Sequence, residues 1–292
     1  MNDTIHNSGF MNTGNSTVNV EQLAAGPNAH FIAAHPTPQP RRAASPPRGI
    51  GLVTIKAVEM RAVIDTFGLR KETTTPSGHD FYTGTVGSVD VVAVRTLEQG
   101  QRSMMATLGY LRQHHDPATF VVVGIGGAIN RDLVIGDVVV ATRVIYYDLR
   151  RETPDGVRNR GEERHAPPAV AHAVNSFFTE HDEPACIETE SSPPFRVLPG
   201  PIGSGDALVM DAESWIRKFL LSYSEYTLAV DMEAAGLTQF CHETPSPGPG
   251  WLVVRGISDL ADEAKTEMHQ PSAARNAAIA LRHLVPYLPR RE

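Results

Sequence analysis

The sequence predicts a single three-layer α/β domain over residues 49–292, with a twisted, mostly parallel or mixed central sheet flanked by helices. Apolar segments rich in β-branched residues alternate with segments of helical periodicity along this part of the chain. The long apolar segments also lack polar alternation, which is typical of strands covered by helices on both faces. The chain has 292 residues, 41% of them hydrophobic, which is enough for one sizeable core.

The first half of the domain is predicted to contain a strand, a helix, a hairpin and a second helix. Residues 50–58 have the composition of a buried strand, and residues 59–68 that of a short helix ending at Gly68. Residues 81–96 have the pattern of a β-hairpin. Residues 100–115 are predicted to be a helix leading into the next strand.

The second half continues the alternation. Strands are predicted at 120–126, 137–148, 195–205 and 250–259, a strand-helix pair at 227–243, and helices at 169–181 and 272–288. Residues 150–168 and 243–250 are rich in Pro, Gly and charge, so they are expected to be surface insertions. Trp215, followed by Ile216, is expected on the buried face of a further helix.

Residues 1–48 differ in composition from the rest of the chain. Asn, Ser, Thr and Ala predominate, and five prolines follow between His35 and Pro47. Such a segment cannot bury enough apolar surface to offset its ordering entropy, so a disordered arm is predicted. The arginines near its end leave a docking tail as the alternative to a solvated linker.

Charge and cysteine usage narrow the function. A net charge of -7 and the absence of a dense Lys/Arg run exclude nucleic acid or an anionic membrane as the main partner, which favours a small polar ligand. Cys186 and Cys241 support neither a disulfide framework nor a thiolate zinc site, and no metal or cofactor is expected. A reducing cytoplasm fits this cysteine usage. In addition, no segment is apolar over the roughly 20 residues that span a bilayer, and the start lacks the features of a signal peptide.

Four predicted strands end in residues suited to ligand binding. In open α/β sheets, ligands lie outside the carboxyl ends of the strands, where this chain places Glu59, a predicted glycine turn at 124–127, Glu233 and Asp259. Each also has a structural interpretation. Glu59 fits the first turn of a helix, Glu233 a solvent-facing helix position, and Asp259 the N-cap of a helix opening at "SDLADEAK". The glycine turn lacks the spacing of known phosphate-binding loops, so it could serve only for close packing.

Five motifs, in order from about Gly51 to Leu284, resemble the landmarks of the nucleoside phosphorylase and nucleosidase superfamily. They are "IKAVEMRAV", "GIGGA" with "LVIGDVVV", "GSGDALV", "VDMEAAG" and "RGISDLAD". The chain is most similar to the methylthioadenosine/S-adenosylhomocysteine nucleosidase branch. This resemblance implies hydrolysis of the N-ribosidic bond of a purine-type nucleoside, which releases the free base and the ribose moiety, by a homo-oligomer.

The resemblance also implies roles for individual residues. Asp259 would be the acid that protonates N7 of the purine, and Glu59 would orient and deprotonate the attacking water. The remaining implied residues contact the substrate. Glu233 would accept hydrogen bonds from the ribose hydroxyls, and Met232 would pack on the sugar. The floor under the sugar and the nucleophile would be formed by Gly124, Gly126 and Gly127, and the base would lie beside Leu208 and Val209.

Three departures from the family pattern bear on these roles. Leu208 stands where the nucleosidases place an aromatic residue against adenine, and Gly124 stands where a serine or threonine opens the glycine segment. Glu59 lies near the place where phosphorylases carry a phosphate-binding arginine, which favours hydrolysis over phosphorolysis. A phosphorylase of the same fold and a non-catalytic nucleoside sensor are the alternatives.

Overall fold

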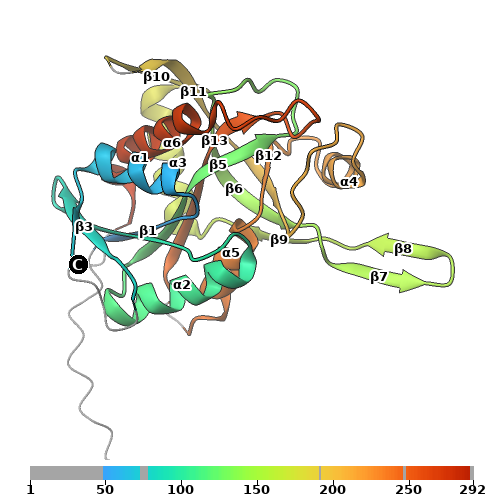
Figure 1. The fold of residues 1–292 in the computed structure, drawn as a ribbon, viewed down its shortest axis with the longest axis horizontal. Coiled ribbons are helices and arrows are strands. Elements are labelled where there is room, and N and C mark those ends of the chain that lie inside the picture. Colours follow the sequence, from blue (N-terminus) through green and yellow to red (C-terminus); the bar gives the residue numbers. More distant parts are fainter. Residues whose placement is uncertain (1–48, 73–77, 191, 246–247, 290–292) are drawn as a thin grey trace, which may run out of the picture. The chain divides into compact units, whose positions relative to one another are not determined.

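A computed structural model describes residues 49–72, 78–190, 192–245 and 248–289. The predicted arm, residues 1–48, lies outside the described residues. In the described part, helices cover both faces of a mixed sheet (Figure 1), which confirms the predicted three-layer α/β class. The helices are α1 (Ala57–Phe67), α2 (Gln101–His114), α3 (Pro168–His181), α4 (Trp215–Tyr223), α5 (Ala234–Glu243) and α6 (Gln270–Leu284), with a 3-10 turn at Val285–Tyr287.

The sheet has β5 (Thr119–Ala128) near its centre, paired in parallel with β1 (Ile50–Thr54) and β13 (Gly250–Asp259). Its order is β10 (Ala185–Thr189), β11 (Ser192–Ser204), β6 (Val138–Tyr146), β13, β5, β1, β4 (Val89–Arg95), β3 (Tyr82–Val86) and β2 (Arg70–Lys71). Two short strands lie off this path, β12 (Ala229–Asp231) beside β11 and β5, and β9 (Glu162–His165) beside β6.

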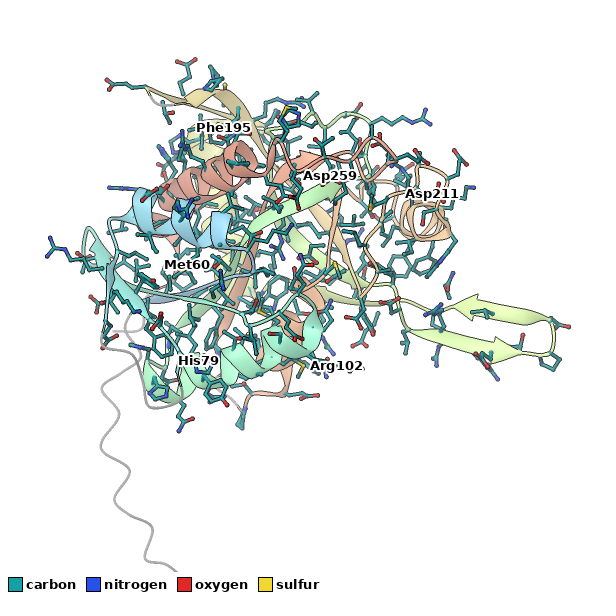
Figure 2. All side chains as sticks on the ribbon, in the orientation of Figure 1. Met60, His79, Arg102, Phe195, Asp211 and Asp259 are labelled. Atoms are coloured by element: carbon teal, nitrogen blue, oxygen red, sulfur yellow. The ribbon has the colours of Figure 1, made fainter. Side chains whose placement is uncertain are left out.

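The strands are buried on both faces because their alternate side chains enter two separate core layers. On one face, Val121 and Leu252 pack with side chains from α1, α3 and α6. On the other face, Val122 and Val253 pack with side chains from α2 and α5. Figure 2 shows side chains filling both layers, with Met60 of α1 in the first of them. This packing accounts for the absence of polar alternation in the sequence.

The glycine segment is not a turn, as the sequence predicted, but part of β5. Its backbone continues the parallel ladder with β13, in which Gly124 is opposite Arg255 and Gly126 opposite Ile257. Glycine weakens a strand in general, but here pairing to a neighbouring central strand decides the conformation. The strand therefore extends to Ala128 and places backbone, rather than side chains, at its carboxyl end.

The junction between β1 and α1 also differs slightly from the prediction. The expected strand to residue 58 ends at Thr54, and α1 begins at Ala57. The Glu59 carboxylate accepts a hydrogen bond from the Lys56 amide at 2.7 Å, which stabilises this start, and Gly68 ends the helix in the left-handed conformation, as predicted.

The predicted insertion at 150–168 contains a β-hairpin and an edge strand. The hairpin, β7 (Arg150–Thr153) and β8 (Gly156–Asn159), extends away from the main sheet (Figure 1). The guanidinium carbon of Arg150, in β7, lies 5.5 Å from the ring centre of Trp215. Trp215 begins α4 and is 41% exposed, so the prediction that it is buried was wrong, whereas Ile216 and Leu220 are buried.

Candidate active site

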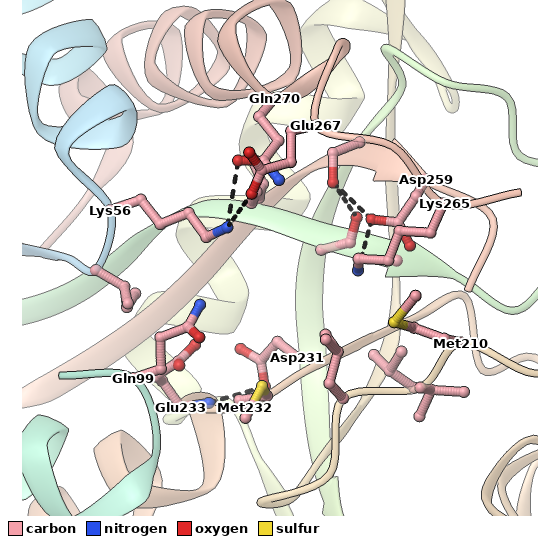
Figure 3. A pocket seen from close by; sticks show the side chains of 18 of the residues that line it. Lys56, Gln99, Met210, Asp231, Met232, Glu233, Asp259, Lys265, Glu267 and Gln270 are labelled. Carbon is pink, nitrogen blue, oxygen red and sulfur yellow. Dashed lines mark hydrogen bonds and ion pairs between the residues drawn. The ribbon is translucent and has the colours of Figure 1, made fainter. Parts of the chain in front are cut away.

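A cavity of about 280 Å³ opens at the carboxyl ends of β1, β5, β12 and β13. Figure 3 shows side chains from these separate segments pointing into the same space. The predicted site residues that line it are Glu59, Gly126, Gly127, Leu208, Val209, Met232, Glu233 and Asp259. The fold thus brings together residues that are 200 positions apart in the sequence.

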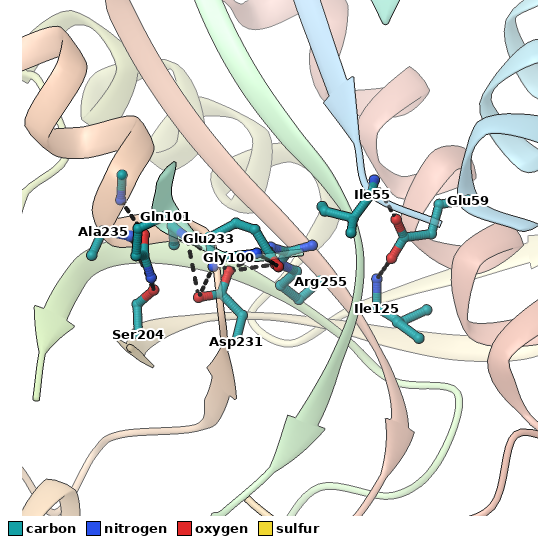
Figure 4. Close-up of polar contacts among 12 residues, drawn as sticks. Ile55, Glu59, Gly100, Gln101, Ile125, Ser204, Asp231, Glu233, Ala235 and Arg255 are labelled. Carbon is teal, nitrogen blue, oxygen red and sulfur yellow. Dashed lines mark hydrogen bonds and ion pairs between the residues drawn. The ribbon is translucent and has the colours of Figure 1, made fainter. Parts of the chain in front are cut away.

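Glu59 is held by three backbone N–H groups. Its Oε2 accepts hydrogen bonds from the amides of Ile55 and Lys56, both at 2.7 Å, and its Oε1 accepts one from Ile125 at 2.9 Å (Figure 4). The side chain is only 2% exposed. The helix-start interpretation therefore holds for Glu59, and the same contacts keep its carboxylate at the cavity.

Gly124 lies behind Glu59, and the cavity-lining residues among those the structure describes do not include it. A Cβ at Gly124 would overlap the Glu59 carboxyl group and lie 2.9 Å from a guanidinium nitrogen of Arg255. The glycine is required because these two side chains occupy the space over β5. Gly124 therefore does not form the predicted floor under the sugar. Its missing side chain instead leaves room for the Glu59 carboxyl group.

Arg255 is a central residue that the sequence analysis missed. Its guanidinium, 1% exposed, donates to Asp231 Oδ2 through Nε at 2.9 Å and Nη2 at 2.6 Å, and Nη2 also lies 3.0 Å from Glu233 Oε2 (Figure 4). A buried charge needs such partners. The available signal was a lone arginine inside the apolar strand "WLVVRGIS", since a buried arginine is rare unless it is paired.

Glu233 is buried, so its interpretation as a solvent-facing residue was wrong. Its Oε1 accepts from the Gly100 amide at 3.0 Å, and its Oε2 contacts Arg255. Burial raises the pKa of Glu233 to about 7, a shift that Asp231 reinforces and that Arg255 and the Gly100 amide oppose. Glu233 therefore exchanges its proton close to neutral pH.

Asp259 lies at the end of β13 and is 3% exposed. Its Oδ2 is 2.9 Å from Lys265 Nζ and accepts from Ser258 Oγ at 2.8 Å, while its Oδ1 accepts from the Ala261 amide at 3.1 Å (Figure 3). The next helix starts only at Gln270, so Asp259 does not cap a helix. Lys265 comes from the intervening loop and was not predicted to be in the site.

Leu208 and Val209 lie on a loop between β11 and α4. Val209 is buried, whereas Leu208 is 55% exposed at the cavity. Tyr147 positions this loop, because its hydroxyl donates to the Ala207 carbonyl at 3.0 Å. The ring of Tyr147 also meets Trp215 edge-on, at 6.4 Å between ring centres.

Lys56 completes the opposite side of the cavity. Its Nζ donates to Gln270 Oε1 at 3.2 Å and lies 3.9 Å from Glu267 (Figure 3). These contacts join the start of α1 to the first residue of α6 and to the loop that precedes it. Among the described residues, no group of three His, Cys, Asp or Glu side chains is arranged to hold a metal ion.

Residues 50–287 match the sequence profile of the phosphorylase superfamily. The chain belongs to this superfamily. Among solved structures, it is similar to futalosine hydrolase of Helicobacter pylori, with 21% identity, a TM-score of 0.66, and coverage of 82% of this chain and 98% of that one. It is also similar to the 5′-methylthioadenosine/S-adenosylhomocysteine nucleosidase of Helicobacter pylori, with 21% identity, a TM-score of 0.67, and coverage of 84% and 100%. The S-adenosylhomocysteine nucleosidase of Streptococcus pyogenes gives 21% identity, a TM-score of 0.67, and coverage of 84% and 99%.

Membership of the phosphorylase superfamily confirms the family and fold predicted from the five motifs. The superfamily match includes every segment that contributes to the cavity, from β1 to the start of α6. No helix in the described part of the chain is long and apolar enough to cross a membrane.

Proposed function

We propose that this protein hydrolyses the N-ribosidic bond of a purine nucleoside, releasing the free base and the ribose moiety. The observation that carries the proposal is the convergence of buried carboxyl groups on one cavity, Glu59, Glu233 and Asp259 among them. These three lie in the first turn of α1, after β12 and at the end of β13, in a chain that belongs to the phosphorylase superfamily.

The transition state of this reaction requires charge stabilisation at both ends of the scissile bond. As the bond between C1′ and N9 breaks, its electron pair moves to the base and positive charge develops on the sugar. A proton donor at the base and a negative environment at the sugar both stabilise this transition state more than the ground state. We assign the proton donation at N7 to Asp259, which would take up that proton from solvent before each turnover, and the sugar side to Glu59 and Glu233.

Glu59 is suited to position one water molecule. A carboxylate has about four lone-pair sites, and three backbone N–H groups occupy three of them in this protein. The remaining site would accept a hydrogen bond from water, which then attacks C1′ and gives up a proton to the carboxylate. Because the three N–H groups fix the carboxylate, the attack direction is fixed as well.

Glu233 and Met232 would hold the ribose. Both line the cavity at the start of α5, where Glu233 would accept hydrogen bonds from the sugar hydroxyls and Met232 would pack against the sugar face. Arg255 and the Gly100 amide fix the Glu233 carboxyl group in place. The likeness to methylthioadenosine/S-adenosylhomocysteine nucleosidases and to futalosine hydrolase supports a nucleoside substrate, and we place its base beside Leu208 and Val209.

The charge at the proposed nucleophile position favours water over phosphate. The nucleophile would lie against Glu59, and the described lining of the cavity has five acidic residues, Glu59, Asp231, Glu233, Asp259 and Glu267, and two lysines, Lys56 and Lys265. A carboxylate beside the nucleophile stabilises a cationic sugar but disfavours a dianion at the same place. We therefore propose hydrolysis and not phosphorolysis.

The proposal is tested by incubating the protein with methylthioadenosine, S-adenosylhomocysteine, adenosine, inosine and guanosine, with and without phosphate. We expect the free base in both conditions, together with the free sugar of the substrate that is cleaved, which is ribose, 5-methylthioribose or S-ribosylhomocysteine. The corresponding sugar 1-phosphate formed only with phosphate identifies a phosphorylase instead. Tight binding without turnover identifies a nucleoside sensor.

We also propose that the protein forms a homo-oligomer, which the family resemblance supports. Sedimentation velocity at working concentration checks this expectation. A single monomeric species would contradict it.

A further inference from the structure

The ion pair between Asp259 and Lys265 is a feature of the cavity that the reaction alone does not explain. Lys265 is 18% exposed in its side chain, lines the cavity, and places its ammonium group 2.9 Å from the carboxylate assigned to purine N7. Any group that approaches Asp259 through the cavity therefore also meets a cation.

The edge of a purine that carries N7 also carries the substituent at position 6. In adenine this edge presents an acceptor at N7 and a donor at the amino group, whereas a 6-oxopurine presents two acceptors, N7 and O6. A protein that reads adenine at this edge needs one donor and one acceptor. A protein that reads a 6-oxopurine needs two donors.

Asp259 has little acceptor capacity left for an amino group. Lys265, the Ser258 hydroxyl and the Ala261 amide already donate to its two oxygens. Of about four lone-pair sites on a carboxylate, one remains, on Oδ1, and it is the site that would carry the proton given to N7. Lys265 carries three N–H donors and no acceptor, and Asp259 takes one of them.

We infer that Lys265 selects 6-oxopurine nucleosides over 6-aminopurine nucleosides, an inference that rests on the proposed function. Lys265 donates a hydrogen bond to O6 while Asp259 donates its proton to N7. Negative charge that reaches O6 as the base leaves is stabilised by the ammonium group, so selectivity enters both binding and turnover. An amino group at position 6 would turn its N–H donors toward those of Lys265, so no hydrogen bond could form between them.

The test compares substrates that differ only at position 6. We measure kcat/KM for inosine and adenosine, and for 5′-methylthioinosine and 5′-methylthioadenosine, so that the sugar is matched in each pair. In the natural protein we expect the 6-oxo member of each pair to be favoured by at least about tenfold, because a donor that is turned toward another donor loses the hydrogen bond that it makes to water.

Lys265→Met should lower this preference by at least about tenfold, and Lys265→Arg, which retains charge and donors, should keep most of it. Lys218→Met is the matched control, since Lys218 lies on α4 outside the cavity lining and pairs with Glu213 at the same 2.9 Å. Thermal unfolding of each variant shows whether it is folded. A natural preference for the amino substrates, or an unchanged ratio in Lys265→Met, overturns the inference.

Calorimetry with the free bases separates this inference from the proposed function. If no nucleoside is cleaved, the proposed hydrolysis fails, yet hypoxanthine should still bind at least about tenfold more tightly than adenine, and Lys265→Met should remove the difference. If the natural protein binds the two bases equally, Lys265 does not select 6-oxopurines, whether or not any nucleoside is cleaved.

Discussion

Glu59, Glu233 and Asp259 differ in their partners, and this predicts different effects of replacing each of them by its amide. Asp259→Asn removes a proton donor, so we expect turnover to fall at least about 100-fold. Glu59→Gln should lower turnover as much, and it also turns an amide NH₂ toward backbone N–H donors, at a cost of about 1–3 kcal/mol in folding stability. Steady-state kinetics and chemical denaturation of both variants check this. Near-normal turnover in either variant would remove that residue from its role.

The pKa of Glu233 predicts a pH dependence of substrate binding. Because burial raises this pKa to about 7, the carboxyl group is mostly protonated below pH 7 and becomes a full acceptor for ribose hydroxyls above it. The KM for a nucleoside should therefore fall as pH rises from 6 to 8. Glu233→Gln should raise KM and flatten this profile. A profile that keeps its inflection in the variant would assign the titration to another group.

The same shift predicts how Glu233 affects folding stability. Glu233 binds its proton more tightly in the folded chain, with a pKa of about 7, than at its ordinary value of 4.5. Its contribution to stability is therefore fully present below pH 4.5 and is lost as pH rises through 7. Denaturation of the natural protein and of Glu233→Gln across this range isolates the contribution by difference.

At the scale of elements, the backbone of α6 lies directly against β13 at Gly256. A Cβ at Gly256 would overlap the backbone of Ala273, in the first turns of α6. Gly256→Ala should therefore force the helix away from the sheet and lower the free energy of unfolding by about 1–3 kcal/mol. Because Asp259 is three residues further along β13, turnover should fall as well.

Gly109→Ala is the control for this substitution. Gly109 lies inside α2, where an added Cβ meets no atom within 4 Å among the described residues. Replacing glycine by alanine in a helix interior should stabilise the protein by about 0.5–1 kcal/mol. If urea denaturation shows Gly256→Ala to be as stable as Gly109→Ala, then α6 and β13 can separate at little cost.

The elements differ in how well the sequence predicted them. The long strands and α1, α2, α3, α5 and α6 follow from periodicity and from turn residues, because their side chains enter two uniform core layers. The glycines of β5 were predicted as a turn, because the pairing partner that keeps them extended is 130 residues away. Lys265 was missed for a similar reason, since its contact with Asp259 depends on a loop conformation that no local pattern encodes.

At the scale of the whole molecule, the superfamily match and the described fold both begin at the end of the predicted arm. We expect deletion of residues 1–48 to leave the melting temperature and the turnover nearly unchanged, because a segment of this composition has no core to contribute. Calorimetry and steady-state kinetics of the shortened chain check this. A clear drop in either would show that the arm docks on the domain or on a neighbouring subunit.

The contact of Tyr147 with both Trp215 and the Ala207 carbonyl gives the molecule an intrinsic optical reporter. The chain has two tryptophans, and Trp251 is 4% exposed in the core, whereas Trp215 is 41% exposed and linked through Tyr147 to the loop that carries Leu208. Occupation of the cavity should thus change the emission of Trp215 and its quenching by acrylamide, and Trp215→Phe should abolish the signal. Fluorescence titration can then rank nucleosides by affinity without any turnover, including those that the protein binds but does not cleave.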